Sequence, residues 1–228
     1  MVRIGFKHPI VNLGIFVFMK MRRVDLFILL ACFMVSSFYA NKPATSRYEF
    51  WWGLGHPFAA IKVKRIHKKL APYYNEAELK LKLDGYSSGG KLDAFRHVFY
   101  MAAFSQKVKA KKLIKLGRAH EKTNYLQFKR NKDEHGLVPD SISCVMDLLN
   151  NEIGVKLGRE NKKMSYEELK QKVIGLVNEG NAHFLAIDKN GNYLDCNNQV
   201  IDLKAYKGKW YIPKCILGFK AQMEMERK

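Results

Sequence analysis

The segment "GGKLDAFRHVFYMAAF", which starts at Gly89, places three ionisable residues among apolar ones. Asp93, Arg96 and His97 stand at i, i+3 and i+4, so they share one face of a predicted helix. A histidine beside a carboxylate can serve as a general base. Such a trio either faces water or is buried with partners from elsewhere in the chain, because unpaired burial costs several kcal/mol.

Two further predicted helices carry polar residues on apolar faces. "GRAHE" contributes His120 and Glu121, and "MDLLNN" contributes Asp147, Asn150 and Asn151 at i, i+3 and i+4. Helices with matched spacing can face one another inside a bundle and satisfy each other's polar groups. We therefore expect the three clusters to converge on one polar pocket.

The pocket has two interpretations. In the first it is reactive: His97 or His120 is the general base, an acidic side chain orients its ring, and the amides hold an oxyanion. The predicted catalytic residues are His97, His120, Asp147, Glu121 and Asp93, and those that bind substrate or support the site are Arg96, Asn150, Asn151 and Tyr100. In the second it is a structural polar core, in which Arg96 pairs with Asp147 or Glu121.

A metal is an open alternative within the reactive interpretation. His97, His120 and Asp147 would form a set of two histidines and one carboxylate with open coordination positions. No "HExxH" spacing supports it, so acid–base chemistry without metal is favoured. The sequence itself requires no cofactor.

The three motifs, in this order, resemble a bacterial family catalogued as domain of unknown function 6973. The family pattern is D-A-x-R-H-x-x-W, then A-H-E, then M-D-x-x-N-N-x-x-G, and the likeness runs from about His56 to Gly180. Tyr100 stands where the family often has tryptophan, and Leu149 where histidine is common. Family members also occur in larger secreted or toxin-like proteins. The resemblance therefore implies a helical domain with a shared site; it is compatible with export and hydrolysis but gives no reaction and no substrate.

Periodicity and capping signals predict the elements that position these motifs. Helices are expected from Pro57, in "NEAELKLKL", over about 92–106, in "AKKLIKLGRAHEKTNYLQF", after Asp140, and from Ser165 with a capping box to Glu168. The expected fold is mainly α, a compact helical bundle over 56–180. Residues 181–228 are expected to hold a small antiparallel β element, with a hairpin at Asn190-Gly191 and further strands in "QVIDL" and "KWYIP".

The start of the chain indicates export. A basic "MKMRR" precedes a charge-free apolar run over 26–40, so residues 1–40 are predicted to be a signal peptide or membrane anchor, and 41–55 a linker. "LLAC" ending at Cys32 offers a lipoprotein alternative. The protein would be periplasmic, membrane-anchored or lipidated. In an oxidising compartment Cys196 and Cys215 could pair; three buried thiols, Cys144 included, are the equal alternative.

Composition defines the class of partner. Formal net charge is +19, from 40 Lys and Arg against 21 Asp and Glu, and 47% of residues are apolar. A packed domain with an anionic envelope or membrane surface as partner fits these values. The basic residues are scattered and no nucleic-acid-binding motif is present, which disfavours a dedicated nucleic-acid role. Nothing in the sequence indicates an oligomeric state.

Overall fold

The computed structural model describes residues 47–74, 77–130 and 138–218. The chain divides into two units, Met1–Lys42 and Pro43–Lys228, and every described residue belongs to the second. The predicted signal or anchor over 1–40, with Cys32, lies outside the described residues. Within the described part, no helix is both long enough and apolar enough to span a membrane.

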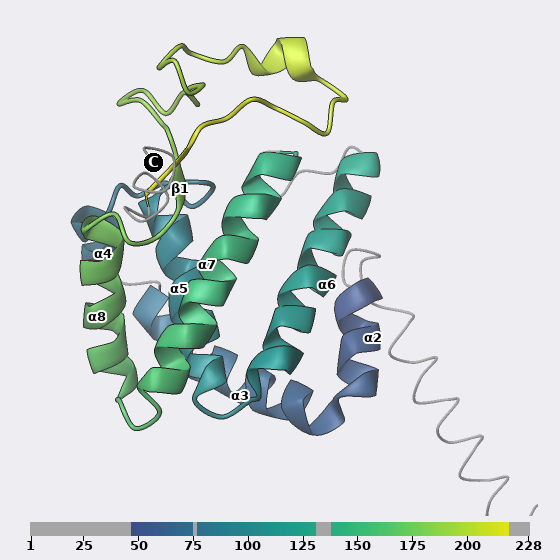
Figure 1. The fold of residues 1–228 in the computed structure, drawn as a ribbon, viewed down its shortest axis with the longest axis vertical. Coiled ribbons are helices and arrows are strands. Elements are labelled where there is room, and N and C mark those ends of the chain that lie inside the picture. Colours follow the sequence, from purple (N-terminus) through teal and green to yellow (C-terminus); the bar gives the residue numbers. More distant parts are fainter. Residues whose placement is uncertain (1–46, 75–76, 131–137, 219–228) are drawn as a thin grey trace, which may run out of the picture. The chain divides into compact units, whose positions relative to one another are not determined.

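The described residues form a mainly helical bundle with a small antiparallel sheet near the C-terminus, which confirms the predicted fold class (Figure 1). The seven helices are α2 (Arg47–Gly55), α3 (Pro57–Tyr74), α4 (Ala77–Lys82), α5 (Lys91–Ser105), α6 (Ala110–Lys129), α7 (Ser141–Glu160) and α8 (Tyr166–Asn178). Helix α5 packs on α7 most extensively and also contacts α3, α6 and α8, so it forms the centre of the bundle.

Helix α5 is central because it is apolar almost all round. Leu92, Ala94, Phe95 and Phe104 are all buried, and at 100° per residue they lie on different sides of the helix. A helix that is hydrophobic on every side is stable only inside a protein. The Asp93 side chain belongs to this helix and is therefore buried with it.

Helices α5 and α7 approach closely through two glycines. A methyl group at Gly154 would collide with the backbone oxygen of Val98, and one at Gly158 with that of Ala102. Small residues four positions apart let two helix backbones come nearer than larger side chains allow. Asn151 and Asp147 lie about one and two turns before Gly154, so this approach brings them to the polar face of α5.

The predicted helix starts agree with the observed caps. The Asp140 side chain accepts hydrogen bonds from the backbone N–H groups of Ile142 and Ser143 at the start of α7. Ser165 and Glu168 form the expected capping box at the start of α8. Each cap satisfies N–H groups that have no partner within the helix, which is why the helices begin there.

The predicted linker over 41–55 is wrong from Arg47 onward, because Arg47–Gly55 form helix α2. The Trp52 ring packs on the hydrophobic core, and its indole N–H donates to the backbone oxygen of Lys112 at 2.8 Å. Glu49 bonds to His120 on α6. The segment is aromatic-rich, and burying part of that surface against α6 compensates for the entropy lost on ordering it.

The C-terminal element is an antiparallel pair, β1 (Phe184–Leu185) with β2 (Ile216–Leu217). The hairpin predicted at Asn190-Gly191 is present as a turn closed by one bridge, between Ile187 and Tyr193. In "QVIDL" only one bridge forms, from Val200 to Leu194, and "KWYIP" forms no strand. A short 3-10 helix, η2 (Leu203–Tyr206), begins at the last residue of "QVIDL" and ends before "KWYIP".

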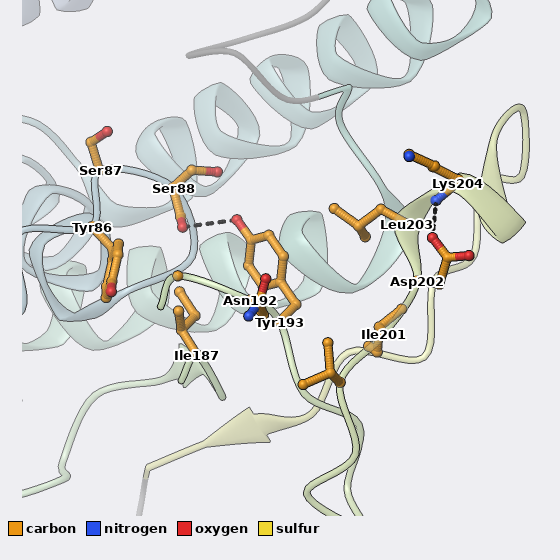
Figure 2. Close-up of a pocket in the computed structure, with 12 residues that line it drawn as sticks. Tyr86, Ser87, Ser88, Ile187, Asn192, Tyr193, Ile201, Asp202, Leu203 and Lys204 are labelled. Carbon is orange, nitrogen blue, oxygen red and sulfur yellow. Dashed lines mark hydrogen bonds between the residues drawn. The ribbon is translucent and has the colours of Figure 1, made fainter. Parts of the chain in front are cut away.

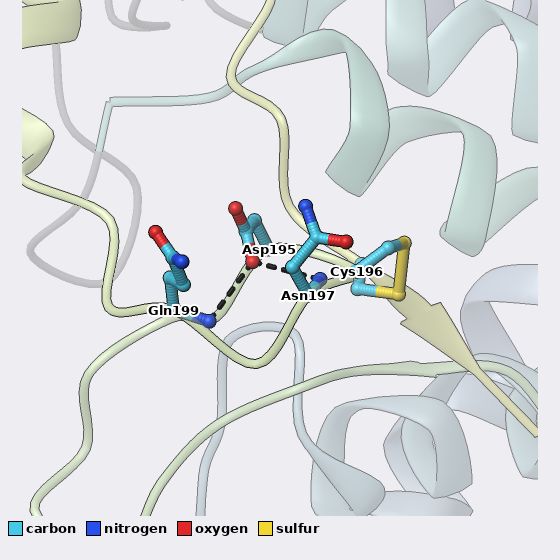
Figure 3. Close-up of a disulfide and its surroundings, with 5 residues drawn as sticks. Asp195, Cys196, Asn197 and Gln199 are labelled. Carbon is cyan, nitrogen blue, oxygen red and sulfur yellow. Dashed lines mark hydrogen bonds between the residues drawn. A yellow bond between two sulfur atoms is a disulfide. The ribbon is translucent and has the colours of Figure 1, made fainter.

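A disulfide joins Cys196 to Cys215, the pair singled out in the sequence (Figure 3). It ties the turn after Tyr193 to the residue that precedes β2. Asp195, beside it, accepts hydrogen bonds from the backbone N–H groups of Asn197 and Gln199. Cys144 is reduced and buried, and burial together with Glu121 raises the pKa of its thiol well above the usual range.

Candidate functional site

His97, on α5, lies between two carboxylates. Its Nε2 atom is 3.2 Å from Oδ1 of Asp147 on α7 and 3.6 Å from Oδ1 of Asp93 on its own helix. All three side chains are at least about nine-tenths buried. The imidazole therefore meets carboxylates from two different helices away from bulk water.

The other ring nitrogen of His97 sets its tautomer. Nδ1 lies 3.1 Å from Oδ1 of Asn151, and an amide oxygen can only accept, so Nδ1 carries a proton. Burial, followed by the charge of Arg96, lowers the pKa of His97 from 6.5 to about 4. The ring is therefore neutral at physiological pH, and Nε2 presents a lone pair to the space between the carboxylates.

Asp93 is held in place by two donors. The backbone N–H of Gly89 donates to Oδ2, and Nη2 of Arg96 donates to Oδ1, each at 2.6 Å. Gly89 has φ of +76°, and a side chain there would also collide with Leu185. The glycine thus allows the loop before α5 to turn its N–H group onto the carboxylate.

These three side chains offer a metal-binding set. One ligand atom from each of Asp93, His97 and Asp147 lies within 4.8 Å of the other two. Among the described residues, no other group of three histidine, cysteine or acidic side chains meets this condition. Two carboxylate oxygens and one imidazole nitrogen are suitable ligands for a divalent cation and leave coordination positions open.

The guanidinium of Arg96 lies beside the potential ligand atoms, in the space that a cation would need. Its Nη2 lies 2.6 Å from Oδ1 of Asp93 and 3.2 Å from Nε2 of His97. This ion pair adds Asp93 to the partners expected for Arg96 from the sequence, which were Asp147 and Glu121. A guanidinium that contacts two of the three ligand atoms stands where a cation would bind, so the donor set fits a cation only if Arg96 swings aside.

A small polar cavity of about 40 Å³ adjoins the cluster. The residues that line it include Asp93, Arg96 and Asp147 of the cluster, together with Asp140, Ser143 and Lys214. The volume is enough for an ion or a few water molecules. The carboxylates at the centre can therefore meet a small polar species.

Lys214 and Ser143 are site neighbours that sequence reasoning missed. The buried ammonium of Lys214 pairs with Asp140 at 2.7 Å and lies 3.4 Å from the hydroxyl of Ser143. Its nitrogen also lies 3.8 Å from the centre of the Tyr193 ring. Asp140 was predicted only as a helix start, and 74 positions separate it from Lys214, so no spacing linked them.

A larger surface cleft of about 620 Å³ lies next to the small cavity (Figure 2). Ser87 and Ser88 line both spaces, so the loop before α5 forms the wall between them. The hydroxyl of Tyr193 donates to the backbone oxygen of Ser88 and thereby braces that loop. Asn192, Asp202 and Lys204 add exposed polar groups to the opposite wall.

Several predicted site residues make other contacts. Nδ1 of His120 lies 3.0 Å from Oε1 of Glu49, and Glu121 accepts from the side chain of Asn124 at 3.0 Å. Asn150 exchanges two hydrogen bonds with the backbone of His183 and so fastens the C-terminal segment to α7. His120 is not part of the set of three potential ligands described above, in which Asp93 stands in its place.

Tyr100 belongs to an aromatic cluster rather than to the pocket. Its ring packs edge-on against Tyr74, Phe99 and Phe104, and His67 lies beside it. Burial raises the pKa of Tyr100. Its contacts are those of a core aromatic that joins α3 to α5.

Residues 50–181 match the model of a family described as "Domain of unknown function (DUF6973)". The chain belongs to the DUF6973 family. The resemblance drawn from the three motifs is thus confirmed, and the matched region contains Asp93, His97, Asp147 and Asn151. It ends before Lys214 and before most of the cleft wall, which lie outside the DUF6973 region. No curated protein and no solved structure matches the chain.

Proposed function

We propose that this protein is an exported, envelope-directed hydrolase whose reactive centre is formed by Asp93, His97 and Asp147. One observation carries the proposal: the neutral imidazole of His97 lies with Nε2 3.2 Å from the carboxylate of Asp147 on the neighbouring helix, and that carboxylate lines a polar cavity. Hydrolysis requires a water molecule that loses a proton as it attacks. An imidazole lone pair flanked by carboxylates is suited to accept that proton or to bind an ion that acidifies the water.

In this proposal Nε2 of His97 and one oxygen each of Asp93 and Asp147 would hold a divalent cation. The cation would supply a bound water of lowered pKa. Asn151 keeps the Nδ1 proton in place, so that Nε2 is the ligand atom. Arg96 turns from Asp93 toward the cavity that it already lines, where its guanidinium can bind an anionic group of the substrate.

The surface cleft beside Ser87 and Ser88 is the proposed substrate entrance. It is large enough for part of a polymer or a small molecule, and it shares these two serines with the small cavity at the centre. Export is supported by the apolar run over 26–40 and by the Cys196–Cys215 disulfide, since such bonds persist in oxidising compartments. The excess of basic residues suits anionic envelope material.

The second candidate is a non-catalytic envelope protein in which the cluster is a structural core. The specific observation in its favour is the ion pair of 2.6 Å between Arg96 and Asp93, which neutralises one carboxylate within the chain. In this case the cluster has no need of an external cation. Buried pairs of this kind occur without catalytic roles.

A paired experiment separates the two candidates. The purified full chain is assayed, with and without added Zn²⁺, Mn²⁺ or Mg²⁺, against ester, phosphoester, amide and glycoside substrates and against isolated envelope polymers. Asp147→Asn keeps the shape of the side chain and removes its charge, and we expect it to lower any activity by about a hundredfold or more. Glu152→Gln, an exposed neighbour on α7, is the matched control and should retain activity.

Two outcomes would contradict the proposal that the protein is a hydrolase. One is the absence of hydrolysis in every arm, with no ion retained by the protein. The other is an activity that Asp147→Asn leaves at the level of Glu152→Gln. Either result, together with strong destabilisation by Arg96→Ala, would favour the structural core.

A further inference from the structure

Large apolar side chains are exposed on the first two described helices. Trp51 and Leu54 on α2 are 52% and 56% exposed, and Phe58 and Ile61 on α3 are 81% and 48% exposed. Within each pair the residues stand at i and i+3, so they share a face of their helix. Single exposed apolar residues are ordinary, but four large ones within eleven positions, on two consecutive helices, need an explanation.

The same face of α3 becomes basic along the helix. Arg65 and Lys68 follow Phe58 and Ile61 at spacings of three and four, and both are exposed. The opposite face of α3, with Ala59, Ile66 and Leu70, is buried in the core. Trp51, Leu54, Phe58, Ile61, Arg65 and Lys68 are called the aromatic–basic face below.

We propose that the aromatic–basic face docks the domain on the surface of an anionic phospholipid bilayer. Tryptophan and phenylalanine favour the boundary between headgroups and acyl chains, and nearby lysine and arginine side chains are attracted to anionic headgroups. The net charge of +19 adds a general attraction to such a surface. A face that is apolar at one end and basic at the other matches this boundary.

The position of the face in the chain favours the same occupant. Six residues separate the end of the apolar run over 26–40 from Arg47, the first residue of α2. If that run is a membrane anchor, α2 and α3 are the first folded elements that the bilayer meets. Docking would orient the domain, with the C-terminal segment at the end of the bundle away from α3 (Figure 1).

The docking is tested on the full chain with a spin label at position 58. Phe58→Cys is made in a Cys32→Ser background; Cys144 is buried and Cys196 and Cys215 are joined, so the label reacts at one site. Accessibility to oxygen and to a water-soluble nickel complex is measured with phosphatidylglycerol vesicles, with phosphatidylcholine vesicles and without lipid. A label at Lys189→Cys, in the exposed turn after β1, is the matched control.

We expect the label at position 58 to become accessible to oxygen and protected from nickel only with phosphatidylglycerol, while the label at 189 stays in water. The double change Arg65→Glu with Lys68→Glu should return the label at 58 to water. Lys189→Glu with Lys204→Glu, equal in charge but on the C-terminal segment, should leave it inserted.

Three results would overturn the proposal. The first is a label at 58 that is as exposed to nickel with phosphatidylglycerol as without lipid. The second is equal insertion into neutral vesicles, which would remove the role of anionic headgroups. The third is a label already shielded without lipid, in which case the dependence of shielding on protein concentration would identify a second copy or the chain's own N-terminal segment as the occupant.

Discussion

The Nε2 atom of His97 lies 3.2 Å from Oδ1 of Asp147, and the two residues belong to different helices, 50 positions apart in the sequence. With Nδ1–H directed to Asn151, both atoms are acceptors. Two acceptors at this distance repel unless a proton or a cation lies near them. The pair is therefore the point at which the protein should respond to metal ions and to pH.

Metal ions should stabilise the wild-type protein through this pair. After removal of metals by a chelator, a divalent cation at a hundred times its dissociation constant should raise the free energy of unfolding by about 2.7 kcal/mol. Asp147→Asn should abolish the increase, and Glu152→Gln should preserve it. Denaturant unfolding with and without Zn²⁺ or Mn²⁺ measures the effect, and an equal response of both variants would exclude the site.

Acid should destabilise the metal-free protein through His97. Its pKa falls from 6.5 in the unfolded chain to about 4 in the fold, so the unfolded state binds more protons between these values. The contribution is fully present above pH 6.5 and is lost as pH falls toward 4. It amounts to about 3 kcal/mol. Chelator-treated wild type and His97→Gln are compared by denaturant unfolding from pH 7 to pH 4, and parallel curves would contradict the prediction.

The close approach of α5 and α7 should be sensitive to a single methyl group. Gly158→Ala would push a side chain against the backbone of Ala102, and we expect a loss of about 1–3 kcal/mol in the free energy of unfolding. Gly175→Ala, in open space on α8, should instead stabilise by about 0.5–1 kcal/mol because alanine favours helix. Thermal or urea unfolding of the two variants should therefore shift in opposite directions.

The buried ion pair of Lys214 and Asp140 should raise the free energy of unfolding. Lys214→Ala leaves a buried carboxylate without its ammonium partner, and we expect a loss of about 3–5 kcal/mol. Lys209→Ala removes an exposed ammonium from the same segment and should change stability by less than about 0.5 kcal/mol. Urea unfolding checks both values, and a small loss for Lys214→Ala would mean that Asp140 finds another donor.

Local signals in the sequence predicted most of the helices, because they depend on neighbouring residues. Asp140 and Ser165 mark helix starts through bonds that reach only two or three residues ahead. The same reasoning failed at α2, where a linker was predicted, because Arg47–Gly55 is ordered by distant contacts such as that between Trp52 and Lys112. Its order could not be inferred from local composition alone.

The sequence by itself determined which residues share a face of each helix: Asp93 with Arg96 and His97, and Asp147 with Asn151. Helical periodicity is enough for that. Only the tertiary structure decided which faces meet. The glycines of α7 draw Asp147 and Asn151 onto His97, whereas His120 turns to Glu49 and Asn150 to the backbone of His183. Packing between helices determines which residues far apart in the sequence become partners. The hydrophobic periodicity of one helix contains no information about that packing.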